Sequence, residues 1–344
     1  MVVVLALAGC GEIPDPLWLL TEEPRVLAFR TEVVEAGPLS QGFLPIPADR
    51  IRDQGLPGDT VEVSAWVVSS EGELEMSELE PAWFLCPPLG GCVSTLGFPG
   101  ATEPCGDELP DRAACSLGEG PTALFTIPRL RKDVPLKDQD RLRVAMVGHV
   151  EDDVSTEACV GIVSDPAGDA WDGCIVGYHF MQLGPVPELY QLALDEGIEV
   201  PDPDASISLY ASQIPLPHYN PEIVTLRLVP SFRDGRSDVT RRVEARPGER
   251  TRLDAGYVYE LDDVFDDRDV QAYITMDGQG FVSPGLLPPS VNLYSGTRGV
   301  LESRPFELER LRAPEEPGVF SLHLVLSMNT GGAAWATFEF EVSE

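Results

Sequence analysis

Six of the seven cysteines lie between positions 86 and 174, and their spacing points to disulfide chemistry. An even number of cysteines in an exported chain predicts disulfides, although sequence alone does not choose the pairing. We expect sequential pairing, because each adjacent pair closes a loop rich in Pro or Gly. The alternative is a zinc cluster made by the first four, although structural zinc sites usually have closer spacings. The six residues are Cys86, Cys92, Cys105, Cys115, Cys159 and Cys174.

Two groups of aspartates suggest a second kind of chemistry, because carboxylate oxygens are the ligands that Ca²⁺ prefers. The first group lies between Cys159 and Cys174, where a disulfide would order it, and the second lies in residues 262–269. Neither has the spacing of an EF-hand loop, so solvated acidic turns are the competing interpretation. The first group is Asp165, Asp169 and Asp172; the second is Asp262, Asp263, Asp266, Asp267 and Asp269.

Enzymatic motifs are not found in the sequence. It has no nucleophile elbow, phosphate-binding loop, dinucleotide fingerprint or His-Glu-x-x-His helix. The four histidines are widely separated, and His323 alternates with Leu322 and Leu324, which predicts a solvent-facing side chain. His149 comes before an acidic run, which we interpret as a strand end followed by a turn. We therefore expect no catalytic residues and no cofactor, with Ca²⁺ as the one alternative.

The overall charge excludes one class of partner. The chain carries 57 acidic and 24 basic residues, for a net charge of −33. Nucleic-acid binding needs clustered cationic side chains, so we expect no nucleic-acid partner. Hydrophobic residues make up 43% of the chain, which is enough for packed cores and argues against wholesale disorder.

The first ten residues indicate export. They form a short apolar stretch that ends in Leu7-Ala8-Gly9-Cys10. This tetrad resembles the lipobox of bacterial lipoproteins, which implies that Cys10 is acylated and becomes the mature N-terminus. No Lys or Arg precedes the stretch, and the alternative is a buried N-terminal strand. Gly11 after the cysteine, by the same resemblance, favours the outer membrane. Two or more acyl chains would anchor the protein stably.

The hydrophobic pattern has a period of two through most of the chain. Val61, Val63, Ala65 and Val67 share one face of an expected strand, and residues 337–342 alternate in the same way. Short strands separated by Pro and Gly turns predict an all-β fold of antiparallel sandwiches. The one helix expected is residues 187–196, with Pro187 in its first turn and Gly197 at its end.

A weak internal repeat suggests two similar domains. Pro57-Gly58-Asp59 and Pro247-Gly248-Glu249 each open a strand, and another expected strand ending in arginine precedes each of them. We predict two tandem sandwiches of immunoglobulin-like or fibronectin III-like type. The expected order is a signal segment (1–10), a tether (11–22), a first sandwich (23–200) with a Cys-rich loop insert (about 86–120), a Pro-rich linker (201–217) and a second sandwich (218–344).

Three short motifs carry a looser resemblance that covers most of the chain. Glu23-Pro24-Arg25-Val26-Leu27-Ala28, Pro57-Gly58-Asp59 and Trp83-Phe84-Leu85-Cys86-Pro87 look like those of uncharacterised myxobacterial-type envelope lipoproteins with Ig-like domains. The resemblance implies a lipid-anchored envelope protein. We expect a non-enzymatic binding or structural module for an envelope protein or a glycan. The alternative is a calcium-assisted carbohydrate-binding or adhesion module.

Overall fold

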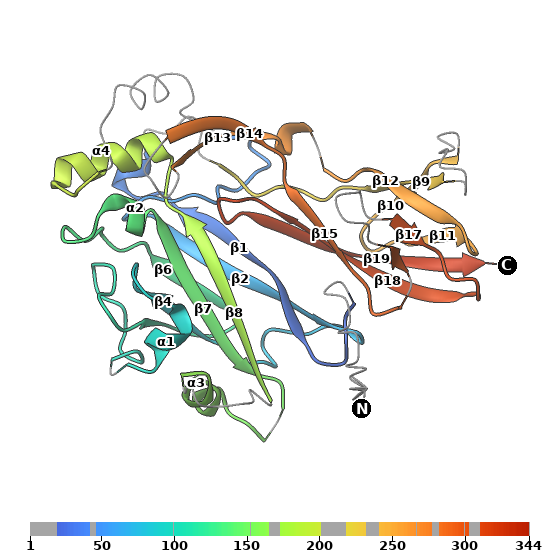
Figure 1. The fold of residues 1–344 in the computed structure, drawn as a ribbon, viewed down its shortest axis with the longest axis horizontal. Helices are drawn as coiled ribbons and strands as arrows, with labels where there is room; N and C mark the ends of the chain where they lie inside the picture. The colour runs from blue at the N-terminus through green and yellow to red at the C-terminus, as the bar shows by residue number, and fades with distance from the viewer. Residues whose placement is uncertain are drawn as a thin grey trace, which may run out of the picture.

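A computed structural model describes most of the chain as an all-β molecule with two sandwich-like units side by side (Figure 1). The described residues are 19–41, 46–98, 100–151, 153–164, 173–200, 218–231, 241–265, 267–276, 282–298, 300–302 and 310–343. The predicted signal segment, its Cys10 and the 201–217 linker lie outside these ranges. No helix in these ranges is long and apolar enough to cross a membrane.

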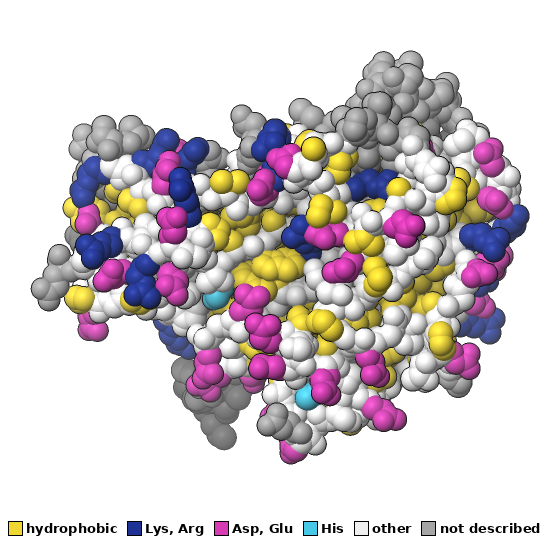
Figure 2. Space-filling view, turned by 180° about the vertical axis from the view of Figure 1, so that it is seen from behind, with side chains coloured by type: hydrophobic (Ala, Val, Ile, Leu, Met, Phe, Trp, Pro, Cys, Tyr) yellow, Lys and Arg dark blue, Asp and Glu magenta, His cyan; other side chains and the backbone are white. Residues whose placement is uncertain are grey.

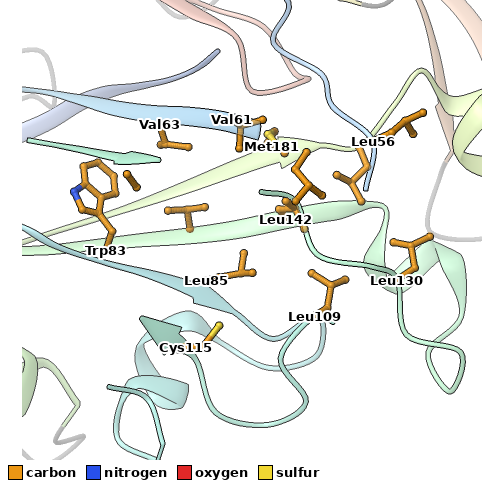
Figure 3. Close-up of a cluster of buried hydrophobic side chains, with 14 of the residues drawn as sticks. Leu56, Val61, Val63, Trp83, Leu85, Leu109, Cys115, Leu130, Leu142 and Met181 are labelled. Carbon is orange, nitrogen blue, oxygen red and sulfur yellow. The ribbon is translucent and has the colours of Figure 1, made fainter. Parts of the chain in front are cut away.

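The first unit is built from two four-stranded antiparallel sheets. In one sheet β2 (Thr60–Ser69) pairs with β1 (Arg25–Glu35) on one side and with β3 (Gly72–Glu73) and β6 (Thr122–Thr126) on the other. The other sheet has the order β5 (Cys115–Glu119), β4 (Ala82–Cys86), β7 (Arg141–His149) and β8 (Cys174–Gln182). The core between the sheets is drawn in Figure 3, where Val61 and Val63 lie opposite Trp83 and Leu85.

Short helices cover parts of the first unit. The predicted helix is confirmed as α4 (Val186–Glu196), which ends at Gly197 in the left-handed conformation with φ 72°. The described residues contain three further α-helices, so the prediction of a single helix was incomplete: α1 (Cys92–Leu96), α2 (Leu136–Gln139) and α3 (Thr156–Ser164). Helices α1 and α3 pack on the outer face of the β4–β7 sheet, where Leu96, Cys159 and Val163 are buried. Their disulfides hold them where so few residues would not form a stable helix alone.

The second unit also pairs two sheets. One has the order β10 (Val243–Ala245), β9 (Leu226–Ser231), β12 (Val258–Asp263), β17 (Arg310–Arg312) and β16 (Leu301–Glu302). The other has the order β11 (Arg250–Asp254), β19 (Ala333–Ser343), β18 (Gly318–Ser327) and β15 (Ser290–Tyr294). A separate hairpin joins β13 (Gln271–Met276) to β14 (Val282–Leu287). The predicted alternation is confirmed, since Leu322, Leu324 and Leu326 all lie in the core.

The two copies of the internal repeat have similar turns, but the strands around those turns pair differently in the two units. Gly58 and Gly248 both have positive φ, and a strand follows each turn. In the first unit the strand before the turn, β1, pairs with β2. In the second unit β9 and β11 belong to different sheets, and β11 pairs in parallel with β19. The similarity therefore describes a local turn-and-strand element that the two units use in different sheet arrangements.

Candidate functional site

The two units contact each other through an apolar seam, which we define as Leu20, Trp66, Val68, Val325 and Trp335. Trp66 and Val68 lie on the face of β2 turned away from its own core, and Val325 and Trp335 lie on β18 and β19. The Trp66 and Trp335 rings stack with centroids 5.9 Å apart. Leu20 adds to the seam, because its amide donates to the Ser295 carbonyl beside β15. Residues 19 and 20, which belong to the predicted tether (11–22), therefore lie against the second unit.

A buried polar junction lies beside the seam. The Asp53 side chain is fully buried, and its Oδ2 accepts a 2.7 Å hydrogen bond from Thr330 Oγ1 in the β18–β19 turn. Burial raises the pKa of the Asp53 carboxyl, while His218 and the Thr330 hydrogen bond oppose that rise. The backbone of Asp53 also donates to the His218 carbonyl at 3.1 Å. These contacts join the first unit to two separate segments of the second.

Asn220 extends the polar junction. Its side-chain amide donates to the Thr31 carbonyl of β1 at 2.8 Å, and its Oδ1 accepts from the Ala333 amide of β19 at 2.9 Å. One buried side chain thereby links a strand from each unit. Because both ends of the amide are satisfied, it stabilises a single relative placement of the units.

The Pro57-Gly58-Asp59 motif has a structural role next to this junction. The Asp59 carboxylate is fully buried and accepts from the Gly37 amide, the Ser40 hydroxyl and the Arg52 guanidinium, the last at 2.8 Å. It thereby anchors the loop that leads to Asp53. Its counterpart in the second unit, Glu249, is exposed, so the motif carries this role only once.

A groove runs along the line where the units meet, with a volume of about 540 Å³. We call it the junction groove. Its walls are residues 26–29 of β1, residues 176–180 of β8, Asn292 of β15 and the β18–β19 hairpin, with Arg141 at its edge. Tyr178 and Phe180 are exposed on β8, and the Arg143 guanidinium lies over the Phe180 ring at 5.9 Å. Aromatic side chains with a few polar groups are typical of binding sites.

A second hollow at the far end of β2 is strongly acidic. It has a volume of about 850 Å³, and its charged lining is made only of glutamates: Glu22, Glu23, Glu71, Glu73 and Glu151. On the face shown in Figure 2, acidic side chains are spread over both units, and hydrophobic ones gather near the middle. In the part of the chain that the structure describes, no three ligating side chains are grouped closely enough to hold a metal ion.

The predicted disulfides are present with sequential pairing: Cys86–Cys92, Cys105–Cys115 and Cys159–Cys174. The Cys-rich insert was expected to form loops alone. It also supplies α1 and the edge strand β5, and Cys115 of β5 reaches the core. The disulfides therefore fasten regular elements as well as loops to the first unit.

The predicted calcium ligands divide into described and undescribed residues. Asp165, Asp169, Asp172 and Asp266 lie outside the described residues, and of Asp263 and Asp267 only the backbone is described. Asp262 forms an ion pair with Arg242. Asp269 is buried, 3.1 Å from Arg50. In the described part of this cluster, arginines are therefore the partners of the carboxylates.

His179 and His323 are both buried in the structure. The prediction that His323 faces solvent was wrong: it is buried against the Trp66 ring, and its Nδ1 lies 3.1 Å from Thr337 Oγ1. His179 is buried 2.6 Å from Thr31 Oγ1 and stacks on Phe29. Burial lowers the pKa of each histidine to about 4. Both rings are therefore neutral packing elements at neutral pH.

No known protein family matches the chain, and no curated protein is similar to it.

Proposed function

We propose that the protein is a lipid-anchored cell-envelope protein, without enzymatic activity, that binds a protein or glycan partner in the junction groove. The observation that carries the binding role is the groove itself, whose walls come from both units. Such a site forms only when the units are fixed relative to each other, and the buried contacts of Asp53 and Asn220 support that arrangement.

Three disulfides support the location outside the cytoplasm, since such bonds persist in oxidising compartments. Cys10 in its lipobox-like context is the proposed anchor, and the outer membrane is the proposed site. The buried ionisable groups have structural partners: Asp59 binds Arg52, Asp53 accepts from Thr330, and His179 contacts Thr31. Their environments serve packing and placement of the units, which supports a binding role without catalysis.

Two experiments test this function. The intact mass of the protein from the membrane fraction should correspond to a chain that begins at Cys10 and carries two or three acyl chains. Six thiols should become reactive only after reduction.

The second experiment tests binding in the groove. A photo-crosslinking residue in place of Asn329, which lines the groove, should form an adduct in whole cells. The matched control replaces the exposed Leu124 on β6, far along the first unit. Adducts at neither position, or equally at both, would contradict binding in the groove.

The calcium-assisted module is the second candidate, favoured by the Cys159–Cys174 disulfide, which closes the loop that contains Asp165, Asp169 and Asp172. It predicts a higher melting temperature in saturating Ca²⁺ than in EDTA, and a loss of that difference when these three aspartates are replaced by asparagine. Equal melting temperatures in Ca²⁺ and EDTA would eliminate this candidate.

A further inference from the structure

The wall of the junction groove formed by β8 is a sheet edge. In the order β5-β4-β7-β8, strand β8 has a partner on one side only. The Gln182 amide points away from β7, because it donates to the Thr330 carbonyl of the hairpin turn at 2.8 Å. Peptide groups of alternate residues in a strand point the same way, and the register of β7 with β8 is regular. The peptide groups of Val176, Tyr178 and Phe180 therefore also point away from β7, along the groove.

The outward amide groups of β8 differ in their hydrogen bonding. Among the residues that the structure describes, no backbone or side-chain group forms a hydrogen bond to the outward N–H groups of Val176, Tyr178 and Phe180. The opposite wall is similar, since Thr31 of β1 presents its carbonyl away from β2 to Asn220, and Phe29 has the same orientation two residues earlier. The groove thus has backbone hydrogen-bonding groups on both walls.

Edge strands are normally protected from pairing by lysine, proline, a bulge or a covering element. Residues 176–180 have no lysine, proline or bulge, and they expose Tyr178 and Phe180 at alternate positions. The hairpin turn covers the Phe180 end of this stretch, because a Cβ on Gly331 would lie 2.6 Å from the Phe180 carbonyl oxygen. Residues 176–179 span about 10 Å at about 3.3 Å per residue, enough to pair with a short extended segment. Thr330 already makes the first hydrogen bond of such a ladder.

Charge limits what can occupy the edge. Two copies of a chain with a net charge of −33 repel each other, which argues against pairing of β8 with a second copy. Arg141 is the charged residue in the lining of the groove, so the local charge is opposite to that of the chain as a whole. An extended segment with a carboxylate would find both its backbone partners and a counter-charge here.

We infer that the junction groove binds an extended, acidic peptide segment of another protein, which adds to β8 as a further antiparallel or parallel strand. This inference rests on the proposed binding function and names the partner class of its site. Strand addition takes affinity from main-chain hydrogen bonds and specificity from alternate side chains. Tyr178 and Phe180 would contact the alternate side chains of the incoming strand.

The probe is a displayed library of random linear peptides about ten residues long, selected on the immobilised full chain, with the selected peptides then synthesised. Two variants separate backbone pairing from side-chain docking. Tyr178→Pro removes the outward N–H, which edge positions tolerate. Tyr178→Thr removes the aromatic ring and keeps the N–H. Strand addition predicts at least about tenfold weaker binding to Tyr178→Pro and a change within about threefold for Tyr178→Thr.

A second measurement uses only the natural protein, in case Tyr178→Pro does not fold. At saturating peptide, amide exchange at Val176 and Tyr178 should slow, because strand addition would pair these two amides. Unchanged exchange at these amides, equal binding to the two variants, or no selected peptide that carries acidic residues would overturn the inference. A dimer in light scattering that Tyr178→Pro abolishes would instead assign the edge to a second copy.

Failure here can be told apart from failure of the proposed function. Adducts from position 329 that contain a glycan would keep the groove as a binding site and reject the peptide. No adduct together with no groove-dependent peptide would reject both.

Discussion

The Asp53 carboxylate and the His323 ring show how single residues set the properties of the contact between the units. Asp53 lies in the polar junction and His323 lies against the seam, and both are buried. Burial disfavours the charged form of each group, so it raises the pKa of Asp53 and lowers that of His323. The pH dependence of stability should therefore report on this contact.

The first prediction concerns acid stability. The folded protein holds His323 at a pKa of about 4, whereas the unfolded chain has the ordinary value of 6.5. The unfolded state therefore takes up the proton first, and stability falls as the pH drops from 6.5 to about 4. The shift corresponds to about 3 kcal/mol. His323→Phe should remove that share of the loss, measured by urea unfolding at several pH values. An unchanged slope in His323→Phe would contradict the prediction.

The second prediction tests the close fit around Asp53. A Cβ added at Gly332 would lie 2.2 Å from Asp53 Oδ2, so Gly332→Ala must displace a buried carboxylate. We expect a loss of about 2 kcal/mol or more in the free energy of unfolding. Gly318→Ala is the matched control in the same sheet, because its Cβ would meet nothing within 4 Å. Equal thermal stability of the two variants would mean that the junction accommodates the methyl group.

At the scale of elements, the period-two pattern correctly predicted which residues share a face and left open what covers the other face. Val61, Val63 and Val67 of β2 lie in the core as expected. The intervening Trp66 and Val68 are also buried, because the second unit covers the outer face of β2. The same contact between the units buries His323 of β18, which we predicted to face solvent. The apolar run at residues 65–68 is the sequence signal in β2 that favours burial on both faces.

The site itself was less predictable than the fold. Cysteine spacing and the Pro-Gly turns indicated disulfides and strand starts, because these depend on neighbouring residues. The junction groove joins residues 26–29, residues 176–180 and the β18–β19 hairpin, which only tertiary packing brings together. Asp53 and Asn220 carry no local signal, since each acts through partners far away in sequence.

The third prediction concerns the disulfide that fastens α3. Cys159 is buried against the outer face of the β4–β7 sheet, and its bond to Cys174 closes a separation of 15 residues. Replacing both cysteines by serine should lower the free energy of unfolding by about 3 kcal/mol. Amide exchange in α3 should also become faster than in α4, which has no disulfide. An unchanged urea midpoint would show that packing alone holds α3.

At the scale of the whole molecule, the seam decides whether the two units behave as one body. Trp66 and Trp335 stack across it, and neither ring belongs to the core of its own unit. The contact is therefore separable in principle from the folding of each unit.

The fourth prediction tests this coupling. Trp335→Ala should remove the stacked ring and weaken the seam while leaving both cores intact. Calorimetry should show one unfolding transition for the natural protein and two for the variant. Val319→Ala, an exposed change on β18, is the control and should keep one transition. A single transition in Trp335→Ala at nearly the natural temperature would assign the coupling to the polar junction.

The docking of Leu20 against Ser295 has a consequence for the proposed lipid anchor. If Cys10 carries the acyl chains, only residues 11–18 separate the anchor from the docked segment. Eight residues reach at most about 30 Å when fully extended, a distance comparable to the hydrocarbon thickness of one bilayer. The protein would then stay within about 30 Å of the leaflet that holds its acyl chains, and a partner would have to come within that distance to bind.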